Sequence, residues 1–290
     1  MSGRASLLRR AVATGISAGV SRSLRKRLER EPPGGAAAWT RTNHAGESVT
    51  LLEGPAVVGG LLAGTLVTDG VRLRTRLVTA AALGVVGGVG AHDDLRGTSS
   101  TKGIRGHLGA LRRGEVTSGA VKVAVIGLSG LVAAAALRRD QDQRATSVAT
   151  LRDGALIAGT ANLLNLLDLR PGRALKVALL SSPALIVPTP GAGLAAPAVG
   201  ASAAALQDDL AGKSMLGDCG ANALGAAIGS AAVAAAPESA RRLLLAGVVG
   251  LTLLSEKVSF TEVIQSTPWL RRLDELGRVG ASGGVSGAGG

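Results

Sequence analysis

Aromatic side chains are nearly absent from this sequence, which has two tryptophans, one phenylalanine and no tyrosine among 290 residues. Charged residues make up only 18% of the chain, whereas soluble domains carry about a quarter. A soluble protein of this length would place more aromatic side chains in its core, because they bury the largest apolar areas. The composition therefore argues against an ordinary soluble domain.

Disulfides, barrel strands and a cleavable leader are also not expected. Cys219 is the only cysteine, so no disulfide can form within the chain. Near the N-terminus, no small-residue cleavage site follows a strong apolar core, so we expect no removable signal. The 43 glycines follow no collagen-like period. Apolar residues do not alternate with polar ones as barrel strands require, which leaves helices.

Apolar residues make up 46% of the chain and gather in blocks of Ala, Val, Leu and Gly. A helix needs about 20 such residues to cross hydrocarbon, and small residues let neighbouring helices approach closely. We expect an all-α, polytopic membrane helix bundle of about nine to ten transmembrane helices with a cytoplasmic acidic cleft. The candidate spans are 7–23, 49–67, 77–91, 119–137, 148–167, 175–187, 193–206, 221–236 and 243–258.

The same pattern predicts four regions along the chain. Residues 1–30 form a weak first span or an amphipathic helix on the membrane surface. Residues 31–258 form the membrane domain, residues 259–278 a cytoplasmic C-terminal segment, and the Gly-rich residues 279–290 a disordered tail.

The net charge of +12 would suggest nucleic acid in a soluble protein. Here the basic residues lie between apolar blocks, as membrane topology signals do, so we expect membrane lipids and no nucleic acid as partners. When the spans alternate sides, the end that carries Asp93 holds the larger share of Lys and Arg. The positive-inside rule then makes that end cytoplasmic, in a multi-pass protein of the plasma membrane.

Three acidic segments fall on this cytoplasmic side, although none of them was used to choose the topology. They are "AHDDLRG", "NLLNLLDLRPGR" and "LGDCGAN", which supply Asp93, Asp94, Asp168 and Asp218. Asn162 and Asn165 recur every three residues before Asp168, so the three share one helical face. Ionisable residues at membrane depth are rare and usually functional, which favours a single site.

Oxygen ligands without a thiolate cluster suit Mg²⁺, with Mn²⁺ as the alternative, and such metals serve phosphoryl transfer. Simpler roles stay open for each segment. Asp93 and Asp94 could be a solvated helix end, the Asn162 face could be hydrogen-bonding glue between helices, and Asp218 could cap a helix. Asp208–Asp209 is interpreted as a solvated loop, and His92 and His107 as phosphate-facing or simply polar.

The order "DD", "NxxNxxD" and "GDxG" resembles the polyprenyl-phosphate N-acetylhexosamine-1-phosphate transferase family, to which the phospho-N-acetylmuramoyl-pentapeptide transferases of peptidoglycan synthesis belong. The resemblance runs from about residue 41 to 229, with "KGIRGHLGALRRGEVTSGAVK" after the first motif. It implies a Mg²⁺-dependent membrane enzyme of cell-wall glycan synthesis. Its substrates would be undecaprenyl phosphate and a UDP-amino sugar, and its products a lipid-linked sugar diphosphate and UMP.

The resemblance also implies roles for single residues. Asp93, Asp94 and Asp168 would be catalytic, and Asp218 would bind the metal. Substrate contacts would come from Asn162 and Asn165 of the NxxNxxD motif. Independently of the resemblance, we expect Arg170, Arg173 and His107 to contact substrate phosphates. A homodimer is an open possibility for the assembly.

Three positions depart from the family's pattern. Pro171 stands where the family often has a second aspartate, and Gly97 stands where a lysine is common. The late histidine-rich loop is replaced by "SEKVSFTEVIQSTPWLRRLDELGR". Three hypotheses follow. The first is an enzyme in which Arg170 and Arg173 contact phosphate. The second is a weakened or inactive relative that binds a lipid phosphate or itself acts as a partner in envelope assembly, and the third is a cation transporter.

Overall fold

The computed structural model describes residues 3–43, 46–96, 117–141, 146–182 and 191–279. Within these ranges the chain is helical apart from one short hairpin, which confirms the predicted all-α class. The strands are β1 (Thr40–Thr42) and β2 (Ser48–Thr50), which pair antiparallel. The helices are α1 (Gly3–Arg30), α2 (Ala36–Trp39), α3 (Glu53–Val67), α4 (Leu73–Arg96), α6 (Ser118–Asp140), α7 (Ser147–Leu167), α8 (Arg173–Ser181), the 3-10 helix η2 (Ala192–Ala195), α9 (Ala196–Leu210), α10 (Gly217–Ala235), α11 (Glu238–Ser255), α12 (Phe260–Ser266) and α13 (Pro268–Glu275).

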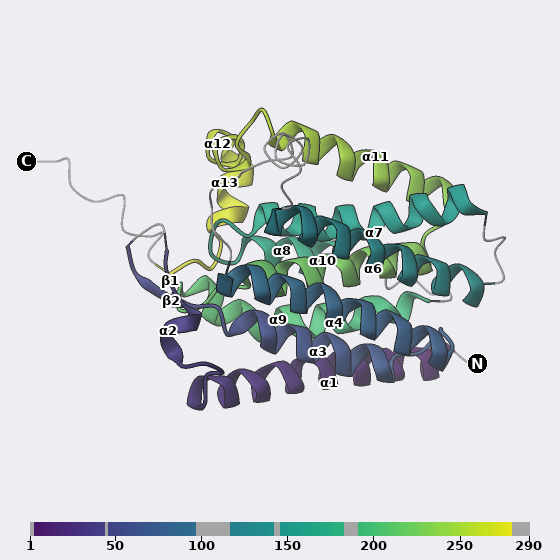
Figure 1. The fold of residues 1–290 in the computed structure, drawn as a ribbon, viewed down its shortest axis with the longest axis horizontal. Coiled ribbons are helices and arrows are strands. Elements are labelled where there is room, and N and C mark those ends of the chain that lie inside the picture. Colours follow the sequence, from purple (N-terminus) through teal and green to yellow (C-terminus); the bar gives the residue numbers. More distant parts are fainter. Residues whose placement is uncertain (1–2, 44–45, 97–116, 142–145, 183–190, 280–290) are drawn as a thin grey trace, which may run out of the picture.

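The long helices lie side by side and run alternately up and down (Figure 1). Eight of the nine expected apolar spans overlap a long helix, and the span 175–187 overlaps the nine-residue helix α8. The hairpin, α12 and α13 gather at one end of the bundle, and α1 begins at the other. Because the directions alternate, α4 and α7 finish where α6 and α10 begin. We call this the acidic end, since it holds Asp93, Asp94, Asp168 and Asp218.

Helix α10 forms the centre of the bundle. It packs against α3, α4, α6, α7, α8, α9 and η2, and nearly all of its residues are buried. Ten of the fifteen residues in its sequence "ANALGAAIGSAAVAA" are Ala or Gly, and such small side chains let the surrounding helices approach its backbone. The acidic end of α10 is therefore held in place from several sides at once.

Helix α1 lies along α3 and α9 and belongs to the bundle. Its Ser17 hydroxyl is buried and donates a 2.7 Å hydrogen bond to the carbonyl of Pro197. Residues 3–30 are thus a helix packed on two neighbours. Whether this helix crosses a membrane or lies on its surface stays a prediction.

Two helices of the described ranges, α4 and α6, are long and apolar enough to cross a membrane. A third candidate is the pair α11 and α12, which is bent by 95°. The expectation of nine to ten transmembrane helices is not confirmed by this criterion. The reasons differ between helices: α3 has only 15 residues, and α7 carries Arg152 and Asp153 in its sequence.

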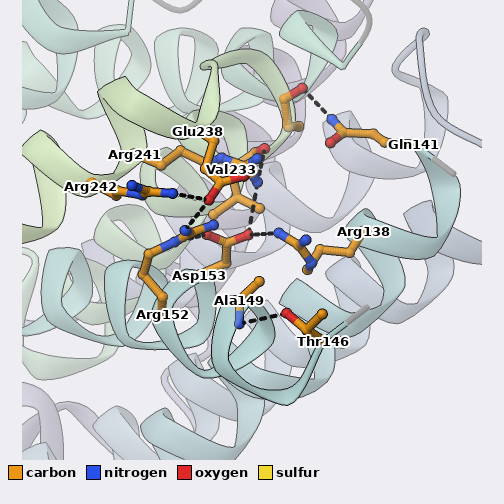
Figure 2. A network of polar contacts seen from close by, with 11 residues as sticks. Arg138, Gln141, Thr146, Ala149, Arg152, Asp153, Val233, Glu238, Arg241 and Arg242 are labelled. Carbon is orange, nitrogen blue, oxygen red and sulfur yellow. Dashed lines mark hydrogen bonds and ion pairs between the residues drawn. The ribbon is translucent and has the colours of Figure 1, made fainter. Parts of the chain in front are cut away.

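The end opposite the acidic end is tied by a buried carboxylate (Figure 2). Asp153 of α7 is fully buried and accepts hydrogen bonds from Arg138 of α6 at 2.7 Å and Arg241 of α11 at 2.8 Å. Arg152 adds a bond of 3.1 Å and also pairs with Glu238. This network joins α6, α7 and α11, and α11 has few other buried residues.

Candidate functional site

The side chain of Asp94, on α4, caps the first turn of α10. Its two carboxylate oxygens accept hydrogen bonds from the backbone N–H groups of Asp218 and Cys219, each at 2.9 Å. Free N–H groups at a helix start favour a negative charge. The "DD" motif on α4 and the "GDxG" motif on α10 are thereby joined directly, although more than a hundred residues separate them.

Two glycines allow this close approach. A Cβ on Gly90 of α4 would lie 2.4 Å from the carbonyl oxygen of Asp218, so a larger residue would push α4 away from α10. Gly217 has a φ of 60°, which L-residues rarely adopt, and a Cβ there would also meet the carboxylate of Asp94. The glycine before Asp218 is therefore required by the backbone of this site.

A lysine of α6 lies between the other two carboxylates. Lys122 Nζ is 2.6 Å from Asp93 Oδ2 and also forms a short ion pair with Asp218 Oδ2. All three side chains are largely shielded from solvent. One ammonium group thus pairs with two carboxylates. It connects α4, α6 and α10 at the acidic end.

Asp168 follows the last residue of α7 and is buried beside the start of α10. It accepts a hydrogen bond from the backbone of Gly217, while its Oδ2 has no hydrogen-bond partner. Burial raises the pKa of Asp168 well above its usual value, and the nearby charge of Asp209 raises that pKa further. The unpaired oxygen is thus available to a proton, a cation or a substrate group.

Asp168 and Asp209 line a cavity of about 370 Å³, which is within the size of ordinary ligand pockets. Arg170, Arg278 and Glu47 also line it, so two guanidinium groups lie beside three carboxylates. Part of the remaining wall comes from the hairpin, through Val49 and neighbouring residues. A ligand with both apolar and negatively charged parts would find partners here.

Another carboxylate, which is buried, lies next to this cavity. Glu53, at the start of α3, is buried and accepts a short hydrogen bond from Ser214, and Arg25 pairs with it at 3.4 Å. Asp209 accepts a 2.9 Å bond from the backbone N–H of Gly172. One oxygen of Glu53 and one of Asp209 are buried without a hydrogen-bond partner. A proton, a cation or a polar group of a ligand could satisfy these two oxygens.

The C-terminal segment, residues 259–278, packs beside the same cavity. Asp274 of α13 is buried and pairs with Arg173 through two hydrogen bonds of 2.7 and 3.0 Å. Arg278 bonds to Asp274 and to the carbonyl of Pro171. Residues 259–278 thus pack on the segment after Asp168. In this chain they occupy the place along the sequence where the resemblance would put a histidine-rich loop.

Two carboxylate oxygens at the acidic end are suitable ligands for Mg²⁺. Asp93 Oδ2 and Asp218 Oδ2 converge on one cation, the ammonium of Lys122, and both are hard oxygen donors. Mg²⁺ usually takes one or two carboxylates and completes its shell with water and substrate phosphates. Within the described residues no three acidic, His or Cys side chains are grouped to hold a metal. The residues therefore suit Mg²⁺ that is shared with a substrate, and Lys122 would have to give way to it.

The predicted site residues have different places in this arrangement. Asp93, Asp94, Asp168 and Asp218 lie together at the acidic end, and Arg170 lines the cavity. Asn162 and Asn165 are half-buried on the last turns of α7. The guanidinium of Arg173 is engaged by Asp274, so a phosphate contact through Arg173 would require this pair to open. His107 and Gly97 lie outside the described residues, as do residues 280–290 of the expected tail.

Sequence reasoning missed four residues of this site: Lys122, Glu53, Asp209 and Arg278. Lys122 and Glu53 are lone charges inside expected apolar spans, a pattern that itself indicates function. Asp209 was interpreted as solvated, and this was wrong: it is only 2% exposed, whereas Asp208 points outward. The "DD" pair at the end of α9 gave no signal for which of the two turns inward.

Neither a scan against protein-family models nor a search of curated proteins gives a match for this chain. A function can therefore be inferred only from the residues of the site and from the resemblance of its three motifs.

Proposed function

We propose that this chain is an integral membrane transferase that moves a sugar 1-phosphate from a UDP-amino sugar to a polyprenyl phosphate at the cytoplasmic face. The acidic end would face the cytoplasm. The helices that overlap the expected spans would form a bundle of about nine transmembrane segments. In this reading the enzyme belongs to cell-envelope glycan synthesis.

The observation that carries this proposal is the convergence of the three motifs. Asp94 accepts hydrogen bonds from the backbone of Asp218, Lys122 pairs with both Asp93 and Asp218, and Asp168 bonds to the backbone of Gly217. Helix packing alone does not require four acidic residues at one end of a mostly Ala and Gly core. A cavity that also holds Arg170 and Arg278 opens beside them.

The chemistry assigned to the site is a phosphoryl transfer. A phosphate oxygen of the lipid attacks the β-phosphorus of the UDP-sugar, the bond from that phosphorus to the bridging oxygen breaks, and UMP leaves with this oxygen. Mg²⁺, when bound, would neutralise charge on the diphosphate. Asp93 and Asp218 are the residues that would hold it.

The side chains of this chain then have separate tasks. Lys122 supplies positive charge next to the reacting phosphates. Arg170 and Arg278 are placed to bind a phosphate or a nucleotide in the cavity. Asp94 holds the start of α10 in position, so that its contribution is to orient Asp218.

A second candidate is the inactive relative, a protein that keeps the fold and binds a lipid phosphate. The observation in its favour is that several expected contacts are already taken. Arg173 is paired with Asp274, both oxygens of Asp94 are used by α10, and Pro171 provides no side-chain ligand. The first candidate converts its substrates to products, and the second does not.

The decisive experiment is a transfer assay with the full chain purified in lipid nanodiscs. Undecaprenyl phosphate, Mg²⁺ and radiolabelled UDP-N-acetyl amino sugars are supplied, and labelled lipid and UMP are measured. The enzyme reading expects equal amounts of both products, and no product when Mg²⁺ is chelated.

The variants Asp218→Asn and Glu31→Gln serve as test and control. Asp218→Asn keeps the size of the side chain and removes its charge, so transfer should be lost. Glu31 is exposed after the end of α1, and Glu31→Gln should transfer at the wild-type rate. No product from wild type with any UDP-amino sugar would overturn the enzyme reading, and full activity of Asp218→Asn would overturn the metal assignment.

A further inference from the structure

Helix α13 carries an exposed apolar stripe in a protein that has few aromatic residues. Trp269, Leu273 and Leu276 are 62%, 47% and 67% exposed. Trp269 and Leu273 are four residues apart, so they share one face of the helix, and Leu276 directly follows its last residue. Trp269 is one of only two tryptophans in the chain, and the other, Trp39, is buried.

The opposite face of α13 is fixed to the bundle. Asp274 is held there by Arg173 and Arg278, and Lys176 donates a 3.0 Å hydrogen bond to the carbonyl of Leu273. The segment therefore cannot turn over to bury its apolar stripe without breaking a buried ion pair. The exposed stripe is a fixed feature of this surface.

The stripe follows a sharp change in chain direction. Helix α11 shows a mostly apolar outer surface, with Leu243, Leu253 and Val249 exposed, and α12 leaves it at 95°. In Figure 1, α12 and α13 lie across the end of the bundle. The 95° bend turns α12 away from the direction of α11, and α13 follows α12 directly after Thr267.

Exposed basic side chains accompany the stripe. Arg271 and Arg272 lie between Trp269 and Leu273 and are exposed, and within α13 neither is paired with Asp274. Tryptophan, leucine and arginine on one short helix are the composition of helices that bind at the headgroup level. Anionic lipids of the cytoplasmic leaflet would attract the two arginines.

We infer that α13 is an interfacial membrane anchor: it inserts Trp269, Leu273 and Leu276 at the headgroup level of an anionic bilayer, with Arg271 and Arg272 contacting the lipid phosphates. The inference adds a lipid-binding surface to the proposed transferase and assigns it no part in the chemistry. Because Asp274 of the same helix is paired with Arg173, lipid binding by α13 would also hold residues 259–278 in place beside the cavity.

The test uses the full chain in vesicles of phosphatidylcholine, alone or mixed with phosphatidylglycerol. A Cys219→Ala background carries either Leu276→Cys or the control Lys213→Cys, each labelled with an environment-sensitive fluorophore. Flotation of the vesicles is measured first. Failure to float would contradict membrane insertion and hence the proposed function, and it would also remove the basis for the anchor.

For protein that floats, the anchor expects a blue-shifted emission at residue 276 and quenching by a headgroup spin label. Emission at residue 213 should stay water-like and be quenched by iodide. Arg271→Gln with Arg272→Gln should remove the additional quenching that phosphatidylglycerol produces. Iodide quenching at residue 276 equal to that at 213 would overturn the inference while leaving the proposed function intact.

Native tryptophan gives a second measurement without a label. In Trp39→Phe the only tryptophan is Trp269, and lipids brominated near the headgroup should quench it. Cross-linking of Leu276→Cys between two chains in vesicles, without quenching by bromolipid, would mean that a second copy covers the stripe and would overturn the lipid assignment.

Discussion

The ammonium group of Lys122 lies between the carboxylates of Asp93 and Asp218, 2.6 Å from Asp93 Oδ2. This single cation joins three helices that are separated in sequence. In the proposed enzyme Mg²⁺ would bind the same two oxygens, so it would compete with the ammonium group, and Lys122 is therefore the most informative residue to change.

Lys122→Met keeps the length of the side chain and removes its charge. Two carboxylates then lose their shared partner, and we expect a loss of roughly 1–3 kcal/mol in the free energy of unfolding. Mg²⁺ should restore more stability to this variant than to wild type, because it no longer competes with an ammonium group. Thermal unfolding with and without Mg²⁺ measures both effects.

In the same variant, transfer should fall by roughly a hundredfold if Lys122 neutralises charge during the reaction. Lys213→Met is the control, since Lys213 is exposed in the connection between α9 and α10. An equal effect of Mg²⁺ on the unfolding of Lys122→Met and wild type would contradict the shared site.

Asp94 provides a test of position against chemistry. Its carboxylate accepts the N–H groups of Asp218 and Cys219. Asp94→Ala should lower the free energy of unfolding by about 0.5–2 kcal/mol, as the loss of a helix cap does. Asp94→Asn keeps one acceptor and should lose less. If Asp94 only positions Asp218, the activity of the two variants should follow their stability; loss of activity in a fully stable Asp94→Asn would instead make Asp94 a reacting group.

The helices and the meeting of the motifs could be predicted from the sequence for one physical reason. Apolar blocks of helical length must run up and down, so every second end lies on the same side. Asp93, Asp168 and Asp218 therefore fell on one side before any contact was known. The all-α class follows from the same blocks, because no alternating strand pattern competes with them.

The partners of these carboxylates could not be predicted. Nothing in the sequence states that Lys122 reaches Asp93 across two helices, or that Asp209 rather than Asp208 faces inward. Such choices depend on helix rotation, which a nearly uniform Ala and Gly pattern leaves open. Arg173 shows the same limit: a phosphate contact fitted its motif, but Asp274 lies a hundred residues away and binds it.

The buried network at Asp153 should dominate stability at the opposite end. Asp153→Asn leaves Arg138 and Arg241 without their carboxylate, and we expect a loss of about 3–5 kcal/mol in the free energy of unfolding. Glu238→Gln is the matched control and should have a much smaller effect, because this side chain is half exposed. Denaturation in detergent measures both, and equal stability of Asp153→Asn and wild type would show that the network does not hold α11.

The pair of Arg173 and Asp274 gives a pH dependence. Burial alone would raise the pKa of Asp274, but Arg173 and Arg278 outweigh it and lower that pKa below 3.8. A carboxylate with a lowered pKa stabilises the folded state above its unfolded pKa, and this stabilisation is lost as the pH falls through the folded pKa. The Tm of Asp274→Asn should thus lie below that of wild type at about pH 7, and the difference should shrink below about pH 4. Glu262→Gln, at an exposed position on α12, is the control, and a difference that grows on acidification would contradict the pair.

The orientation of the bundle is tested by two exposed positions at opposite ends. Arg139 lies at the end of α6 and Lys213 lies in the connection that leads into α10. The positive-inside rule puts Lys213 in the cytoplasm. In a Cys219→Ala background, an impermeant maleimide added to intact cells should therefore label Arg139→Cys at once and Lys213→Cys only after lysis. Expression and flotation of both variants provide the control for insertion. Labelling of Lys213→Cys in intact cells, with Arg139→Cys protected, would place Asp93, Asp168 and Asp218 outside the cell. No cytoplasmic UDP-sugar could reach them there, so this outcome would overturn the proposed function itself, whatever the activity of the purified protein.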